Sequence, residues 1–166
     1  LDIPQRVTIV NADDVVTMDD DPVSALRNKK KSSMRVAIDL VGMGEADAIV
    51  SAGNTGALVA ISRYVLKMIS GIKMPALGAK MPTISGRPVR LLDMGATLDC
   101  SAQQLLQFAM MGTIVCQVID HLSKPTVALL NIGSEDIKGN QLVKESRALI
   151  EANPQINYTG YVEGNE

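Results

Sequence analysis

Aromatic side chains are scarce in this 166-residue chain, which has no Trp, one Phe and three Tyr. Proteins that bind single-stranded nucleic acid stack the bases on aromatic rings, so the scarcity argues against that function. Neither sign of charge dominates, since 16 Lys and Arg residues face 18 Asp and Glu residues. General nucleic-acid binders carry a strongly basic face. We therefore expect no nucleic-acid partner.

Metal-ligating and redox-active side chains are equally few. The chain has one His and two Cys, and the spacing of Cys100 and Cys116 matches neither a zinc site nor a redox pair. We expect reduced thiols, no metal site and a cytoplasmic protein. No apolar stretch approaches the roughly 18 residues that a membrane span needs, and no secretory signal opens the chain.

The composition is otherwise that of a globular protein, with 46% hydrophobic and 20% charged residues. A chain of this length can bury the core of one ordinary domain but not of two. It begins with Leu1 rather than Met and stops just after a predicted strand. We therefore expect residues 1–166 to form a single domain that is a fragment of a longer chain.

Short β-branched runs alternate with segments of helical periodicity. The runs predict strands at residues 6–10, 48–51, 89–93, 126–130 and 156–162, with a further extended piece between Pro75 and Pro82. Capping residues predict one helix from Pro22 after Asp21 and another after the capping box of Ser101 and Gln104. Further helices are predicted from residue 33 to the glycines at 42 and 44, after 53–56, and from about 140 to 151.

This alternation of strands and helices predicts an α/β fold. Strands that are separated by helices pair mostly in parallel, and the helices cover both faces of the sheet. We expect three layers, α/β/α, in an incomplete domain.

Three of the predicted strands end in polar loops that contain glycine, at residues 51–56, 93–99 and 131–140. The carboxyl ends of parallel strands meet at one edge of a sheet, where ligands bind in open α/β folds. Each loop leads into a helix N-terminus, whose free N–H groups and dipole favour an anion. Lys138 adds a positive charge beside one of them. The three loops together predict a site for an anion of the size of phosphate.

Each loop taken alone is more often a plain strand-to-helix turn in which Asn or Thr caps the next helix. None matches the phosphate loop that ends in Gly-Lys-Ser/Thr, and none matches Gly-x-Gly-x-x-Gly after a strand. Two acidic pairs, Asp93 with Asp99 and Glu135 with Asp136, have the chemistry to hold a cation, although helix capping explains them as well. The basic residues between 27 and 35 are either a solvated helix end or a surface for an acidic partner.

Several short motifs follow one another along nearly the whole chain. They are Lys30-Lys31-Ser32-Ser33-Met34, Ala46-Asp47-Ala48 leading into Ser51–Gly56, Leu92-Asp93-x-Gly95-Ala96, Asp99-Cys100, Leu105-x-x-Phe108-Ala109-x-Met111-Gly112, Leu130-Asn131-Ile132-Gly133 with Lys138-Gly139-Asn140, and Val162-Glu163-Gly164-Asn165. In this order they resemble the PlsX family of bacterial phosphate acyltransferases. Thr97 departs from the family pattern, which usually has Asn there. Family members are also longer, with an additional opening strand and a C-terminal half, so the chain resembles a middle segment.

The resemblance implies transfer of a fatty acyl group from acyl carrier protein to inorganic phosphate, which gives acyl phosphate for bacterial phospholipid synthesis. It also implies a fold similar to that of isocitrate and isopropylmalate dehydrogenases and phosphotransacetylases, a homodimer, and no organic cofactor. Peripheral membrane association of the full-length enzyme is compatible with the family, although this segment has no evident amphipathic anchor.

Under this resemblance Lys138 and Asn140 are the candidate catalytic residues, and Lys138 supplies charge to the phosphate or to the developing oxyanion. Phosphate is already ionised at neutral pH, and a thiol with a pKa of about 8.5 leaves readily, so no Cys or Ser nucleophile is needed. The candidate phosphate-binding residues supply hydrogen bonds or, at the glycines, close approach of the backbone. They are Ser51, Gly53, Asn54, Thr55, Gly56, Asp93, Gly95, Asn131 and Gly133.

Other functions stay open beside this one. A phosphotransacetylase-like enzyme that acts on acyl-coenzyme A would use the same fold and the same anion site. A non-catalytic fragment that binds phosphate or acyl carrier protein is the alternative from another class. A dehydrogenase of the related fold would need a carboxylate cluster for metal and a nucleotide site, and the sequence shows neither clearly.

Overall fold

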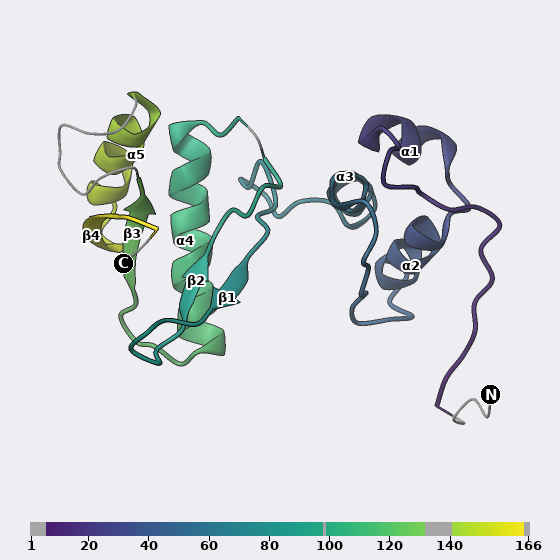
Figure 1. Cartoon of the computed structure of the whole chain (residues 1–166), viewed down its shortest axis with the longest axis horizontal. Coiled ribbons are helices and arrows are strands. Elements are labelled where there is room, and N and C mark those ends of the chain that lie inside the picture. Colours follow the sequence, from purple (N-terminus) through teal and green to yellow (C-terminus); the bar gives the residue numbers. More distant parts are fainter. Residues whose placement is uncertain (1–5, 98, 132–140, 165–166) are drawn as a thin grey trace. The chain divides into compact units, whose positions relative to one another are not determined.

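The computed structural model describes residues 6–97, 99–131 and 141–164. The chain divides into two compact units, Leu1–Ser70 and Gly71–Glu166 (Figure 1). Within the described residues the regular elements of the first unit are helices, whereas the second combines helices with two small sheets. The alternating sequence pattern therefore resolves into one helical unit and one mixed unit.

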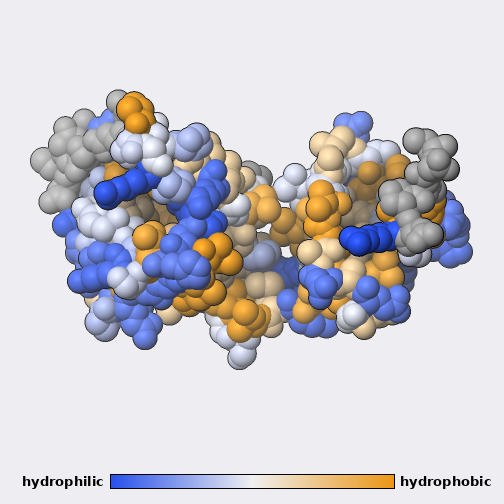
Figure 2. Space-filling view, turned by 90° about the horizontal axis from the view of Figure 1, so that it is seen from below, coloured by the Kyte–Doolittle hydropathy of each residue, from blue (hydrophilic) through white to orange (hydrophobic). Residues whose placement is uncertain are grey.

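Large hydrophobic side chains reach the surface of both units (Figure 2). Ile9 and Ile69 in the first unit are well exposed, and so are Ile84, Val118 and Ile119 in the second. Scattered apolar residues are ordinary on a protein surface, but extended apolar surface is typical of a face that another chain or segment covers.

The first unit contains three helices, each opened by a capping side chain. Asp21, Ser32 and Asn54 each accept a hydrogen bond from an amide in the first turn of the helix that follows. These amides have no partner within the helix, so the side-chain oxygen satisfies them. The helix starts predicted at Pro22 and at residue 33 are confirmed, whereas the third helix begins at Thr55, inside the loop that is predicted to precede it. The helices are α1 (Pro22–Asn28), α2 (Ser33–Gly42) and α3 (Thr55–Leu66).

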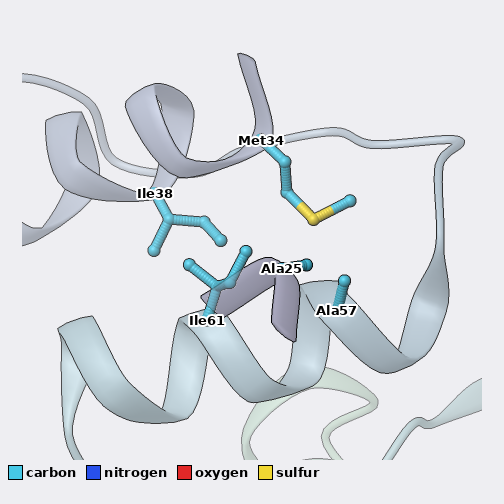
Figure 3. Packing of buried hydrophobic residues seen from close by; sticks show 5 residues of the cluster. All are labelled: Ala25, Met34, Ile38, Ala57 and Ile61. Atoms are coloured by element: carbon cyan, nitrogen blue, oxygen red, sulfur yellow. The ribbon is translucent and has the colours of Figure 1, made fainter. Parts of the chain in front are cut away.

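The three helices bury one apolar cluster between them (Figure 3). Its members come from all three helices, and their side chains point toward one another: Ala25, Met34, Ile38, Ala57 and Ile61. Met34 and Ile38 lie on one face of α2, as their helical spacing predicts. Complete burial of a side chain such as Ile61 stabilises the unit by about 1.5–3 kcal/mol relative to exposure.

The prediction of two strands in this unit is wrong. Residues 6–10 and 48–51 form no strand, and Val50 in the second segment is fully exposed. β-branched residues favour a strand only where a neighbouring strand accepts their backbone hydrogen bonds and a core covers their side chains. No strand lies beside either segment in the described part of this unit. Ile49 instead packs against the helical cluster.

The second unit contains two separate two-stranded sheets and two helices. The predictions of a capping box before the long helix, of a strand at 126–130 and of a helix that ends at 151 are confirmed. The elements are β1 (Ala79–Met81), β2 (Val89–Leu91), α4 (Ala102–Ile119), β3 (Thr126–Leu130), α5 (Gln141–Glu151) and β4 (Asn157–Val162).

β1 and β2 pair antiparallel, which departs from the expected parallel arrangement. A short turn joins them, in which the Gly86 amide donates to the carbonyl of Thr83 at 3.0 Å. Parallel strands need a crossover of about a dozen residues or more, so a connection this short permits antiparallel pairing alone.

β3 and β4 pair in parallel, as the strand–helix–strand order predicts. The pairing continues past the end of β3, where the Asn131 amide donates to the carbonyl of Val162 at 3.0 Å. The chain is thus a mixed α/β protein with parallel strands in one of its sheets.

α4 is an 18-residue helix without a charged side chain. By length and composition alone it is apolar enough to cross a membrane, which overturns the expectation that no stretch reaches this size. Its glutamines interrupt the apolar pattern but carry no charge, so the mean hydropathy of the helix stays high. Length and composition do not distinguish a span from the apolar helix of a water-soluble protein.

A carboxylate just after α4 joins this helix to both strands of the hairpin. Asp120 accepts hydrogen bonds from Nε of Arg90 on β2 at 2.5 Å and from Nζ of Lys80 on β1 at 2.9 Å. The Arg90 guanidinium and the Lys80 ammonium hold the pKa of the Asp120 carboxyl well below its usual range. The network ties β1 and β2 to one end of α4.

Candidate functional site

The residues predicted to form the site fall in both units. Residues 51–56 lie in the first unit, and Asp93, Gly95 and Asn131 lie in the second. Gly133, Lys138 and Asn140 lie outside the described residues. The hydrogen bonds of each described residue show which of its polar atoms are able to bind a ligand.

Asn54 is buried, with 8% of its surface exposed, and caps α3. Its Oδ1 accepts the Ala57 amide at 3.0 Å. Its Nδ2 faces three backbone carbonyls in the first unit, those of Thr17 at 3.2 Å, Met18 at 3.1 Å and Asp20 at 3.0 Å. A carboxamide has two donor hydrogens, so this side chain is fully engaged within the protein.

The segment that Asn54 holds is also tied to the end of α1. Asp20 accepts Nζ of Lys29 and the Thr17 amide, each at 2.6 Å. The Lys29 ammonium, together with the Thr17 amide, lowers the pKa of the Asp20 carboxyl. Lys29 also donates to the carbonyl of Val15 at 2.8 Å. Sequence reasoning missed this network, because Asp20 lies in a run of three Asp residues that reads as a solvated acidic loop.

The two glycines of the first loop have neighbours from their own chain. A Cβ added to Gly56 would lie 2.8 Å from Cγ of Pro22 on α1, which is closer than real Cβ contacts. A Cβ on Gly53 would lie 3.2 Å from Cε of Met34. Packing of the loop against α1 and α2 therefore accounts for both glycines, whether or not a ligand approaches.

Ser51 and Thr55 are exposed, in contrast to Asn54. The Ser51 Oγ accepts the Gly53 amide at 3.3 Å. Thr55 and Gly56 are the first two residues of α3, where amides have no partner within the helix. Asn54 already accepts the amides of Ala57 and Leu58. The exposed start of α3, with the amides of Thr55 and Gly56, is therefore the part of this loop best placed to bind an anion.

The second predicted loop is organised around Asp93. Its carboxylate accepts three amides, those of Leu77 at 2.8 Å, Ala96 at 3.2 Å and Thr97 at 2.9 Å. Gly95 has φ +91°, a conformation that glycine adopts without strain. The Ala96 and Thr97 amides of this loop are thus already bound to the carboxylate of Asp93 and are not free for an anion.

Thr97 lies at the end of this loop. The family that the chain resembles usually has Asn at this position. Its hydroxyl oxygen is buried, and the described part of the chain offers it no hydrogen-bond partner. Buried polar atoms are usually hydrogen-bonded, so this hydroxyl is an exception within the loop.

Three of the five cations between residues 27 and 35 are paired with carboxylates in the first unit. Lys29 pairs with Asp20, Lys31 with Asp13 and Arg35 with Asp39. This pairing accounts for most of the basic run by contacts within the chain.

Cavities and metal-ligating clusters do not add to the predicted residues. A pocket of about 320 Å³ between the hairpin and α4 is lined by small and apolar side chains with Arg90, and it includes no predicted site residue. Across residues 6–97, 99–131 and 141–164, no group of three or more His, Cys, Asp or Glu residues is arranged to hold a metal ion.

The sequence of the chain matches a known protein family over nearly its whole length. A family model described as "Fatty acid synthesis protein" matches residues 2–166. The chain belongs to the fatty acid synthesis protein family. This is the PlsX family that the order of its motifs resembles, so the resemblance is confirmed.

Curated relatives within the fatty acid synthesis protein family are named "Phosphate acyltransferase". The protein of Shewanella sediminis (strain HAW-EB3) is 50% identical over 165 residues, which are 99% of this chain and 48% of that protein. The protein of Shewanella pealeana (strain ATCC 700345 / ANG-SQ1) is 51% identical over 164 residues, again 99% and 48%. The protein of Shewanella woodyi (strain ATCC 51908 / MS32) is 50% identical over 164 residues, with the same coverage. The chain spans about half the length of these relatives.

Proposed function

We propose that the full-length protein containing this chain is a phosphate acyltransferase that moves a fatty acyl group from acyl carrier protein to inorganic phosphate. The observation that carries this proposal is 50% identity to a protein named "Phosphate acyltransferase" over 99% of this chain. The products are the free thiol of the carrier protein and an acyl phosphate for phospholipid synthesis.

The reaction needs little acid or base assistance. A phosphate oxygen attacks the carbonyl carbon of the thioester, the new carbon–oxygen bond forms, and the carbon–sulfur bond breaks. The sulfur leaves as a thiolate and takes up a proton, which is easy because the pKa of a thiol is about 8.5. The enzyme must hold phosphate against the carbonyl and stabilise the oxyanion that develops there.

The proposed roles follow from this chemistry. Lys138 supplies positive charge to phosphate or the oxyanion, and Asn140 donates a hydrogen bond to them. The hydroxyls of Ser51 and Thr55 and the amides of Thr55 and Gly56 contact phosphate, since Thr55 and Gly56 are exposed at the start of α3 and Ser51 is exposed in the loop before it. Asn131 and Gly133 contribute from the loop after β3. Gly53, Asp93 and Gly95 shape their loops for this task.

The fold and assembly of the full-length enzyme belong to the same proposal. Residues 1–166 belong to a single α/β domain of it, which has three layers, α/β/α, and a mostly parallel sheet similar to the isocitrate and isopropylmalate dehydrogenase fold. It acts as a cytoplasmic homodimer without an organic cofactor. The parallel pairing of β3 with β4 supports this architecture.

The decisive experiment follows thiol release from a long-chain acyl-acyl carrier protein by the full-length gene product, with and without phosphate. Release that requires phosphate is the expected result. A folded protein without phosphate-dependent release would contradict the proposal. Faster turnover of acetyl-coenzyme A than of the carrier substrate would instead identify a phosphotransacetylase, and binding without turnover would identify a non-catalytic module.

Substitution of Lys138 tests the assigned charge. Lys138→Ala in the full-length enzyme should lower turnover by about tenfold or more, because the charge that stabilises phosphate or the oxyanion is lost. The far-ultraviolet circular dichroism and the melting temperature should not change. Lys144→Ala, on the exposed face of α5, is the matched control and should keep full turnover. Equal turnover of the two variants would reject the role of Lys138.

A further inference from the structure

Asn54 is placed to act on the first loop without touching a ligand. We infer that Asn54 is a positioning residue, which holds the start of α3 against residues 17–20 and thereby sets the exposed groups of Thr55 and Gly56. This inference rests on the proposed function, since it assigns a role within the same phosphate site. It replaces a direct hydrogen bond from Asn54 to phosphate.

The first argument is the count of hydrogen-bond donors on the side chain. Nδ2 has two hydrogens and faces three carbonyls at 3.0–3.2 Å, while Oδ1 accepts the Ala57 amide. Phosphate is an acceptor and needs a donor. Asn54 is buried, so its Nδ2 could contact phosphate only by breaking its hydrogen bonds to these carbonyls. The carbonyls would then lose their partner.

The second argument is that the 15–20 segment is held at both of its sides. Asn54 ties it to α3, and Lys29 ties it to the end of α1 through Asp20 and the carbonyl of Val15. The Asp20 carboxylate also accepts the Thr17 amide, which closes the turn between them. Residues 15–20, which we call the brace, therefore connect α1 to α3. Asp20 influences the start of α3 only through this segment.

The third argument is the tight packing of α1 on the start of α3. The site of a Cβ at Gly56 is filled by Pro22, the first residue of α1. Only Asp21, the N-cap of α1, lies between Pro22 and the segment that Asn54 holds. A displacement of this segment would therefore move the surface on which Gly56 rests, and small displacements of binding groups are costly in catalysis.

The experiment uses Asn54→Ser in the full-length gene product. Serine keeps an oxygen that can cap α3 but has no amide hydrogens for the three carbonyls. We expect kcat/KM for phosphate to fall about tenfold while KM for the acyl carrier substrate stays unchanged, because only phosphate is assigned to the start of α3. Asp21→Ser is the matched control: it exchanges one capping residue for another at α1 and should leave both constants unchanged. Unchanged phosphate kinetics for Asn54→Ser would overturn the inference.

A double-mutant cycle separates positioning from direct binding. Asp20→Asn removes the charge that pairs with Lys29 but touches no proposed ligand group. If Asn54 acts through the brace, the combined loss of kcat/KM in Asn54→Ser/Asp20→Asn is smaller than the product of the two single losses. A combined loss equal to that product would show independent action and would contradict the inference.

Hydrogen exchange gives a readout that does not depend on activity. In Asn54→Ser of the full-length protein, amides 17–20 should exchange faster than in the native protein, whereas those of α4 should not change. Unchanged exchange at 17–20 would overturn the inference whatever the kinetics. If the native protein shows no phosphate-dependent release, the proposed function fails, and faster exchange would still establish Asn54 as the residue that holds this segment.

Discussion

At the scale of single residues, Gly56 has two possible explanations, because both packing within the chain and binding of a ligand favour a glycine at this position. A glycine in a polar loop before a helix is typical of close approach by phosphate. Here the space beside Gly56 is occupied by Pro22, and the space beside Gly53 by Met34. Gly56 is required by the contact of the loop with α1, and Gly53 lies close to the flexible end of Met34 on α2, so the presence of these glycines alone does not demonstrate a ligand.

The packing at Gly56 leads to a prediction on stability. Gly56→Ala should destabilise the protein by about 1–3 kcal/mol, because the added Cβ would lie 2.8 Å from Cγ of Pro22 and the two helices must separate. Gly112→Ala in α4 is the control. Its Cβ would meet only Cδ1 of Leu92 at 3.7 Å, so alanine should stabilise the helix by about 0.5–1 kcal/mol. Urea unfolding measures both, and opposite signs are the expected outcome. A Gly56→Ala protein as stable as the native one would show that Pro22 yields freely.

At the scale of elements, helices and strands differ in how well local signals predict them. The starts of α1, α2, α3 and α4 follow from capping residues directly before them in the sequence. Residues 6–10 have the β-branched composition of a strand, yet no strand pairs with them in the described part of their unit. The difference arises because a cap is a contact within one turn, whereas a strand needs a partner that lies elsewhere in the chain.

The hairpin and α4 provide a prediction on pH dependence. The paired cations lower the pKa of Asp120 in the folded protein, so its contribution to stability is complete above the ordinary Asp pKa and is lost as the pH falls toward the folded value. Asp120→Asn should therefore lower the melting temperature at pH 7, and the difference from the native protein should shrink below about pH 4. Thermal unfolding between pH 7 and pH 2 measures this.

Glu45→Gln is the control for that titration, since Glu45 is exposed and has no ion pair among the described residues. Its melting temperature should follow the native protein at every pH. If Asp120→Asn also ran parallel to the native protein across the range, the network with Arg90 and Lys80 would not contribute to stability.

At the scale of the whole molecule, the chain leaves sheet edges and apolar side chains without cover. Each described sheet has two strands, so β3 and β4 each have an edge that no described strand pairs with. Such edges and the exposed apolar residues of α4 favour association with another chain. The chain also spans only 48% of relatives such as the Shewanella sediminis protein.

The isolated 166-residue chain should therefore self-associate. Sedimentation at several concentrations should give an apparent mass that rises from one chain toward two or more, because edge strands and apolar surface are covered on association. Val162→Lys places a charge at the exposed end of β4 and should weaken the association, since charged edge strands resist pairing. A mass of one chain at every concentration would contradict this expectation.

Local patterns along the chain are enough to predict the helices whose caps are local, the strand at 126–130, and membership of the family, which depends on the order of motifs. Which polar atoms are engaged depends instead on the folded arrangement of distant segments. Asn54 meets the carbonyl of Met18 from 36 positions away, and Asp93 meets the Leu77 amide from 16 positions away. Their residue types are equally suited to a ligand and to a backbone contact. A hydrogen bond between distant positions depends on how the chain folds back, and no spacing in the sequence encodes that directly.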